Sequence, residues 1–136
     1  MAHLIVFGGL GMLAGSAARA LLARLPRGAL VPPPWCELVV GALWATCGCG
    51  WSSGLLPTRW LPLMLGLAWL GVAAGTVDLM HRRLPDALTL PAGPLALAAA
   101  LPLGAPVVLR AAVCGMVLVG AHMAVRALAP AALGAG

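Results

Sequence analysis

Apolar residues fill most of the chain in long runs, which are separated by short stretches rich in Pro, Gly and Arg. An α-helix needs a run of about 20 apolar residues to cross the hydrocarbon core of a bilayer. The runs predict five such helices, over residues 3–23, 37–56, 60–77, 87–104 and 107–128. We therefore expect an all-α, polytopic membrane helix bundle that forms one domain over residues 1–136.

Proline residues mark where this pattern cannot continue as regular helix. The run Pro32–Pro34 lacks backbone donors and disfavours helical geometry in each preceding residue, so residues 24–36 are predicted to form a loop. The fourth predicted helix contains Pro91, Pro94 and Pro102. We expect it to be kinked, with its freed carbonyl groups satisfied by neighbouring helices rather than by lipid.

Composition supports the membrane assignment. Apolar residues make up 62% of the chain and charged residues 8%, whereas a soluble domain of this size would need more charge to cover its surface. The net charge of +5 comes from eight Arg and no Lys. In a membrane protein such an excess sets orientation, so we expect the lipid bilayer as a partner and no nucleic acid.

The positions of the Arg residues predict how the chain is oriented. If the loop that contains Arg82 and Arg83 is cytoplasmic, alternation of the helices brings Arg24, Arg27 and Arg126 to the same side. Arg19 can snorkel to that side as well, which leaves only Arg59 and Arg110 outside. The N-terminus is then extracytoplasmic and the C-terminus cytoplasmic. The first apolar run lacks a basic segment before it, so we interpret it as a retained helix, with a cleaved signal peptide as the alternative.

Small residues and cysteines suggest packing rather than chemistry. Gly11 with Gly15, and Gly71 with Gly75, have the spacing that lets helices approach closely in lipid, either inside the bundle or across a homo-oligomer face. No C-x-x-C pair occurs among the four Cys, so we expect no metal site. His122 and His81 have no nucleophile at an interpretable spacing, which favours a packing role for His122 and a headgroup role for His81.

Two of the three acidic residues lie within residues 76–91, TVDLMHRRLPDALTLP. Asp78 falls where the third helix meets its loop, and a carboxylate at that depth is costly unless it is wetted, paired or functional. It can pair with Arg82 one helical turn later, or face a wet cavity at the membrane surface. Asp86 follows Pro85 and precedes an apolar run, which suits the N-cap of the fourth helix.

These residues carry a resemblance to a known family. Asp78 and Asp86, with seven residues between them, together with the string LPDALTLP at 84–91, resemble the first active-site motif of type IV prepilin peptidases, which are polytopic aspartic proteases. The string PWCEL at 34–38 resembles the short members, which lack an inserted zinc-binding domain. The likeness is strongest over residues 60–136.

The resemblance implies a function and roles for individual residues. Such enzymes cleave the leader peptides of prepilin or pseudopilin proteins at the cytoplasmic face of the plasma membrane, without a metal or organic cofactor. Asp78 would be one of two catalytic carboxylates, with Asp86, Arg82 and Arg83 in supporting roles. Two carboxylates are needed because one activates water while the other donates to the scissile carbonyl, in opposite protonation states.

The family's second aspartate lies in a G-x-G-D motif, and here the chain departs from the pattern. It ends in Leu133–Gly136, LGAG, which resembles that motif without its Asp. We expect that the second catalytic Asp would have followed Gly136 and that Asp86 does not replace it. Two alternatives stay open: an inactive remnant of the family, and a small transporter or channel subunit that uses Asp78 as an ion or proton site.

Overall fold

The computed structural model describes residues 2–24, 30–81 and 86–128, and within these ranges it contains helices and no strand. In these ranges five α-helices and two short 3-10 helices follow one another. They are α1 (Ala2–Arg24), α2 (Trp35–Ser52), η1 (Thr58–Trp60), α3 (Leu61–His81), α4 (Asp86–Ala100), η2 (Leu101–Leu103) and α5 (Ala105–Leu128). The prediction of an all-α bundle of five helices is confirmed.

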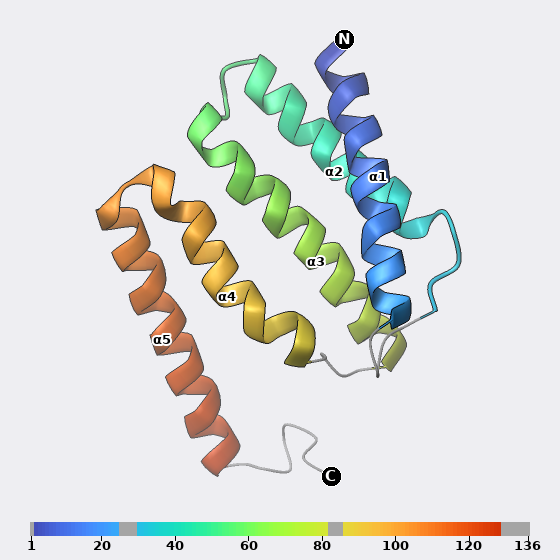
Figure 1. Cartoon of the computed structure of the whole chain (residues 1–136). Coiled ribbons are helices and arrows are strands. Elements are labelled where there is room, and N and C mark those ends of the chain that lie inside the picture. The colour runs from blue at the N-terminus through green and yellow to red at the C-terminus, as the bar shows by residue number, and fades with distance from the viewer. Residues whose placement is uncertain (1, 25–29, 82–85, 129–136) are drawn as a thin grey trace.

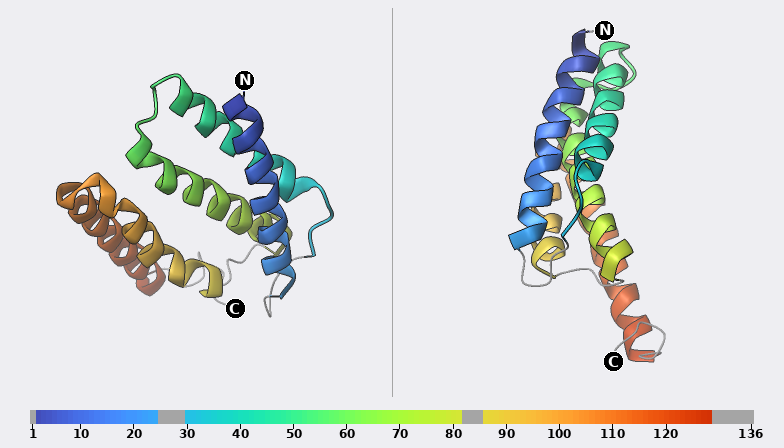
Figure 2. Two further views of the ribbon diagram at one scale, coloured as in Figure 1. Left: turned by 45° about the horizontal axis from the view of Figure 1, so that its top comes forward. Right: turned by 90° about the vertical axis from the view of Figure 1, so that its right-hand side faces the viewer.

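The helices run alternately in opposite directions, as Figure 1 shows. α1 and α2 lie at one side of the bundle, α3 and α4 follow, and α5 lies at the other side, in both Figure 1 and Figure 2. Consequently α1, α3 and α5 finish at the end of the bundle where α2 and α4 begin. We call this the Asp78 end, because Asp78 lies in the last turn of α3.

Glycines allow α1 and α2 to pack backbone against backbone. A Cβ atom on Gly11 would lie 2.8 Å from Cα of Gly41, and one on Gly15 would lie 2.5 Å from the carbonyl oxygen of Cys36. A Cβ atom on Gly48 would lie 2.6 Å from the ring of Phe7. Any side chain at these positions would therefore push the two helices apart, and the predicted packing role of Gly11 and Gly15 is confirmed.

α3 attaches to this pair through a small core and two tryptophan hydrogen bonds. The indole N–H of Trp69 donates to the carbonyl oxygen of Ala14 in α1 at 2.8 Å. That of Trp44 in α2 donates to the carbonyl oxygen of Leu65 at 3.1 Å. The buried core lies at the junction of all three helices and consists of Ala18, Leu22, Val31, Cys36, Ala73 and Val77.

Among the described residues, three helical segments have the length and apolarity to cross a membrane: Ala2–Arg24, Thr58–Met80 and Ala105–Val125. Large apolar side chains cover their outer faces, and α5 has no buried residue in its most apolar stretch. Exposed apolar surface on this scale is typical of contact with lipid. Within the described ranges α2 and α4 are not among these candidate spans, and α4 is 15 residues long.

Three predicted helix ends differ from the observed ones by four residues: α2 and α4 end earlier, whereas α3 ends at His81 instead of residue 77. α2 ends at Ser52 instead of residue 56, since Gly54 adopts a φ of +76° that stops the helix. α4 continues through Pro91 and Pro94 but ends at Ala100, where the segment containing Pro102 tightens into η2. The helix thus accommodates Pro91 and Pro94 in its interior and ends before Pro102.

Gly71 and Gly75 do not behave as Gly11 and Gly15 do. No atom of the described chain outside their own stretch of helix lies within 4 Å of a Cβ placed at either position. The prediction that this second pair packs inside the bundle is therefore wrong for the part of the chain that the structure describes. Spacing alone did not reveal which side of α3 faces its neighbours.

This difference yields a matched pair of substitutions. We expect Gly15→Ala to destabilise the bundle by about 1–3 kcal/mol, because its methyl group would overlap the Cys36 carbonyl. Gly75→Ala, on an open surface, should be neutral or stabilise by up to about 1 kcal/mol. Unfolding in mixed micelles with increasing SDS, followed by tryptophan fluorescence, measures both. Equal effects of the two changes would contradict the observed packing.

Candidate functional site

Asp78 projects from the last turn of α3 at one end of the bundle. The helix continues for three residues beyond it, to His81. Val77, one residue earlier, is 1% exposed in the core, whereas Asp78 and Leu79 are exposed. The buried side of the helix thus anchors the turn, and the carboxylate is on the accessible side. Asp78 makes no hydrogen bond or ion pair with another described side chain.

The other residues of the predicted site are only partly described. Asp86 is the first residue of α4, so its backbone lies at the helix N-terminus, as the sequence predicted. Its side chain lies outside the described part of the structure, and so do Arg82 and Arg83. The pairing of Asp78 with Arg82 and the capping role of Asp86 therefore stay predictions. Along the chain, α3 ends three residues after Asp78, and α4 begins after a gap of four residues.

Sequence reasoning missed an ion pair near the same end of the bundle. Nε of Arg19 in α1 lies 2.8 Å from Oε1 of Glu37 in α2 and donates a hydrogen bond to it. The Arg19 side chain is 37% exposed and that of Glu37 is 11% exposed. Arg19 was expected to extend to the membrane surface; instead it reaches across to α2. The available signal was Glu37 itself, because an acidic residue in an apolar helix needs a partner.

One oxygen of Glu37 has no partner. Oε2 is buried and accepts no hydrogen bond from any residue that the structure describes. Buried acceptors are normally paired, and an unpaired one costs about 1–3 kcal/mol. The ion pair is therefore only half satisfied within the described bundle.

Contacts connect this pair to the turn that bears Asp78. Cys36, next to Glu37, is 1% exposed and packs in the same buried core as Val77 of α3. Val77 directly precedes Asp78. The start of α2 thus contacts α3 directly beside the candidate catalytic turn.

The reactions that the Asp78 end can support depend on how many of its carboxylates are accessible and not held by a counter-charge. Asp78 is exposed and unpaired among described residues, so it can act as a general base or acid toward a bound group. Glu37 is buried and held by Arg19, so it is not available for the same role. Among described side chains Asp78 is the one accessible carboxylate.

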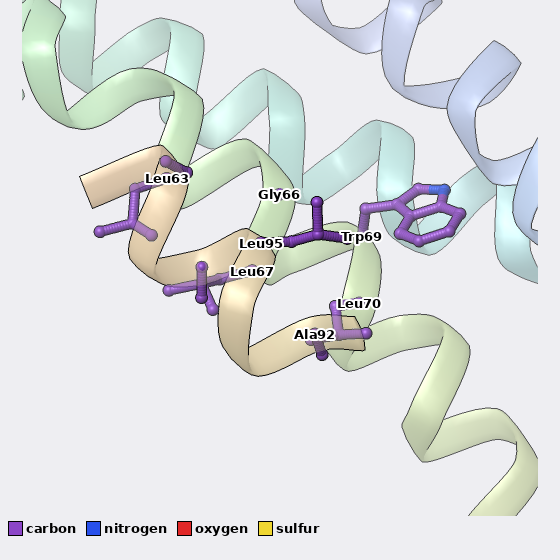
Figure 3. A pocket seen from close by; sticks show the side chains of 9 residues that line it. Leu63, Gly66, Leu67, Trp69, Leu70, Ala92 and Leu95 are labelled. Atoms are coloured by element: carbon purple, nitrogen blue, oxygen red, sulfur yellow. The ribbon is translucent and has the colours of Figure 1, made fainter. Parts of the chain in front are cut away.

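The described cavity lies elsewhere. A space of about 160 Å³ opens between α3 and α4, and Figure 3 shows Leu63, Leu67 and Leu70 of α3 around it, with Ala92 and Leu95 of α4. Leu70 precedes Asp78 by eight residues, or roughly 12 Å along the helix. The lining of the cavity is almost wholly apolar. The cavity therefore offers no group for chemistry and is separate from the Asp78 end.

Two other sequence candidates are placed by the structure. His122 is exposed on α5, which corrects its predicted packing role, while the side chain of His81 lies outside the described part. The four Cys are free, with Cys36 buried and Cys49 and Cys114 exposed. Across the residues that could be searched, no three His, Cys, Asp or Glu side chains gather closely enough to hold a metal ion.

Comparison of the chain with models of protein families, with curated proteins and with solved structures finds no match in any of the three.

A double-mutant cycle tests the ion pair. We expect Arg19→Leu to cost about 3–5 kcal/mol, because it leaves a buried carboxylate without its counter-charge. Glu37→Leu should cost less, since the partly exposed Arg19 can turn to water. The double replacement should be close to the native stability, because two apolar side chains can fill the same space.

The SDS titration used for the glycine variants measures each member of the cycle. Arg24→Leu, an exposed change in the last turn of α1, is the matched control and should leave the midpoint unchanged. Additive costs for the two single changes would show that Arg19 and Glu37 do not interact energetically.

Proposed function

We propose that the chain carries half of the active site of a membrane-embedded aspartic endopeptidase similar to type IV prepilin peptidases. Asp78 is one of its two carboxylates, and Asp86, Arg82 and Arg83 support it. The substrates are prepilin or pseudopilin proteins, which are cleaved after a short basic leader. The observation that carries the proposal is an accessible carboxylate, without a partner among the described side chains, on the last turn of an apolar helix that the LPDALTLP string follows after two Arg residues.

The position of Asp78 suits cleavage at a membrane surface. Residues 58–80 form a candidate membrane span, so Asp78 lies near its end, where water and a peptide can reach it. A carboxylate deeper in the span would be shielded from both. Placing this end in the cytoplasm of a plasma membrane follows from the Arg distribution and would bring Asp78 to the side where leaders are removed.

Peptide hydrolysis by this chemistry requires a second carboxylate. One carboxylate must accept a proton from water while the other, protonated, polarises the carbonyl, and close like charges keep the two states apart. Glu37 is held by Arg19 and does not supply the second group. In the proposal the partner of Asp78 is an aspartate of a G-x-G-D segment, as in the family that the chain resembles. Leu133–Gly136 lies outside the described residues.

This requirement predicts the activity of two forms of the protein. The 136-residue chain in proteoliposomes should not process a prepilin-type substrate, because Asp78 is the one accessible carboxylate among its described side chains and the proposal assigns the second role to a G-x-G-D aspartate. A chain extended after Gly136 by an Asp and the final helices of a short prepilin peptidase should cleave it. In the extended chain Asp78→Asn should reduce the rate by roughly 10²–10⁴-fold, measured by the gel shift of the processed substrate.

Matched variants show whether a loss of cleavage is due to the Asp78 carboxylate itself. Glu37→Gln keeps shape and lies on another helix, so a loss confined to Asp78→Asn identifies the catalytic carboxylate. Cleavage by the 136-residue chain that is lost in Asp86→Asn would instead make Asp86 the second carboxylate. An extended chain that inserts normally and cleaves equally well with and without Asp78 would refute the proposal. Ion flux in vesicles that depends on Asp78, without any cleavage, would favour the transporter alternative.

A further inference from the structure

Stability alone does not explain why an ion pair, rather than two apolar residues, occupies positions 19 and 37. Glu37 is 9% exposed, and its Oε2 is buried without a partner among the described residues. Moving a carboxylate out of water is costly, and well-packed apolar residues in place of a buried ion pair are often equally stabilising. Neighbouring positions of this junction, such as Ala18, Leu22 and Val40, are filled by apolar residues in that way. An ion pair adds specificity instead, because its two charged groups meet at only one axial register and one rotation of the two helices.

We propose that Glu37 is a positioning residue for Asp78. The inference rests on the proposed function, because it concerns how the catalytic turn is held. Glu37 is not itself a catalytic residue, as Arg19 engages it and it makes no contact with Asp78 among the described residues.

The first link of the argument joins α1 to α2. Gly15 lies against the backbone of Glu37, where a Cβ atom would be 2.6 Å from its Cα. One turn later, Arg19 reaches Oε1 of Glu37 at 2.8 Å. The close approach fixes the distance between the helices, while the ion pair fixes their rotation. A change of rotation would separate the charges and leave the carboxylate buried alone.

The second link joins α2 to α3. Cys36, adjacent to Glu37, packs in the same buried core as Ala73 and Val77 of α3. Val77 directly precedes Asp78, and Ala73 lies about one turn earlier. Rotation of the start of α2 would therefore shift the buried side of the Asp78 turn.

A distance measurement in the 136-residue chain tests this inference without any activity. Spin labels are placed at Leu21 and Leu79, exposed positions on α1 and α3, with Cys47, Cys49 and Cys114 changed to Ala and the buried Cys36 retained. The native chain should give one narrow distance distribution. Arg19→Leu with Glu37→Leu should fold with an unchanged SDS midpoint yet give a broader or shifted distribution.

The control removes a different interhelical bond. Trp44→Phe deletes the hydrogen bond to Leu65, which precedes Asp78 by 13 residues or roughly 20 Å along α3. We expect it to leave the measured distribution unchanged. If the double Leu variant folds and keeps the native distribution, Glu37 does not position the turn and the inference fails.

Cleavage by the extended chain gives the second readout. The double Leu variant should lower kcat by roughly 10- to 100-fold with KM unchanged, as misplacement of a catalytic group does. Native kcat in this variant, with cleavage still abolished by Asp78→Asn, would overturn the positioning role while leaving the proposed function intact. If Asp78→Asn has no effect on cleavage, the proposed function fails, and the distance distribution alone decides how Glu37 acts on the turn.

Discussion

The close approach of α1 and α2 is the constraint on which the rest of the structure depends. Gly11 and Gly15 allow backbone contact with Gly41 and with the Cys36–Glu37 segment. In an apolar solvent, helices gain little from burying apolar side chains, so close packing and polar contacts must hold them together. At this separation Arg19 can reach Glu37, and the paired helices present the surface on which α3 is held.

The helices pack more closely on one side of the bundle than on the other. The difference depends on where small residues face a neighbouring helix. α1, α2 and α3 share a buried core and two tryptophan hydrogen bonds, whereas the described side chains of α5 include no buried one. The glycines of α3 face open space, so they contribute no comparable contact. The candidate site belongs to the well-packed part, since Val77 is in the core and Asp78 begins the exposed end. A rigid support on one side and access on the other is what a catalytic carboxylate requires.

Much of the fold could be predicted, because apolar length and proline position act locally. The five helices and the all-α class follow from runs long enough to satisfy their own backbone groups in lipid. Helix ends were less predictable: α2 stops at Ser52 because of a turn at Gly54, and α4 passes through two prolines before ending. The position of Asp78 at a helix end was also predictable, as the apolar run stops there.

The sequence by itself determined the number and order of the helices, their apolar outer surfaces and the concentration of acidic residues around one helix end. These features depend on the composition of each segment and on its neighbours along the chain. Only the tertiary structure decided that Gly15 packs and Gly75 does not, and that Glu37 binds Arg19. The two charged residues are 18 positions apart on different helices. Whether they meet depends on the rotation and depth at which α1 and α2 pack, which no local pattern specifies.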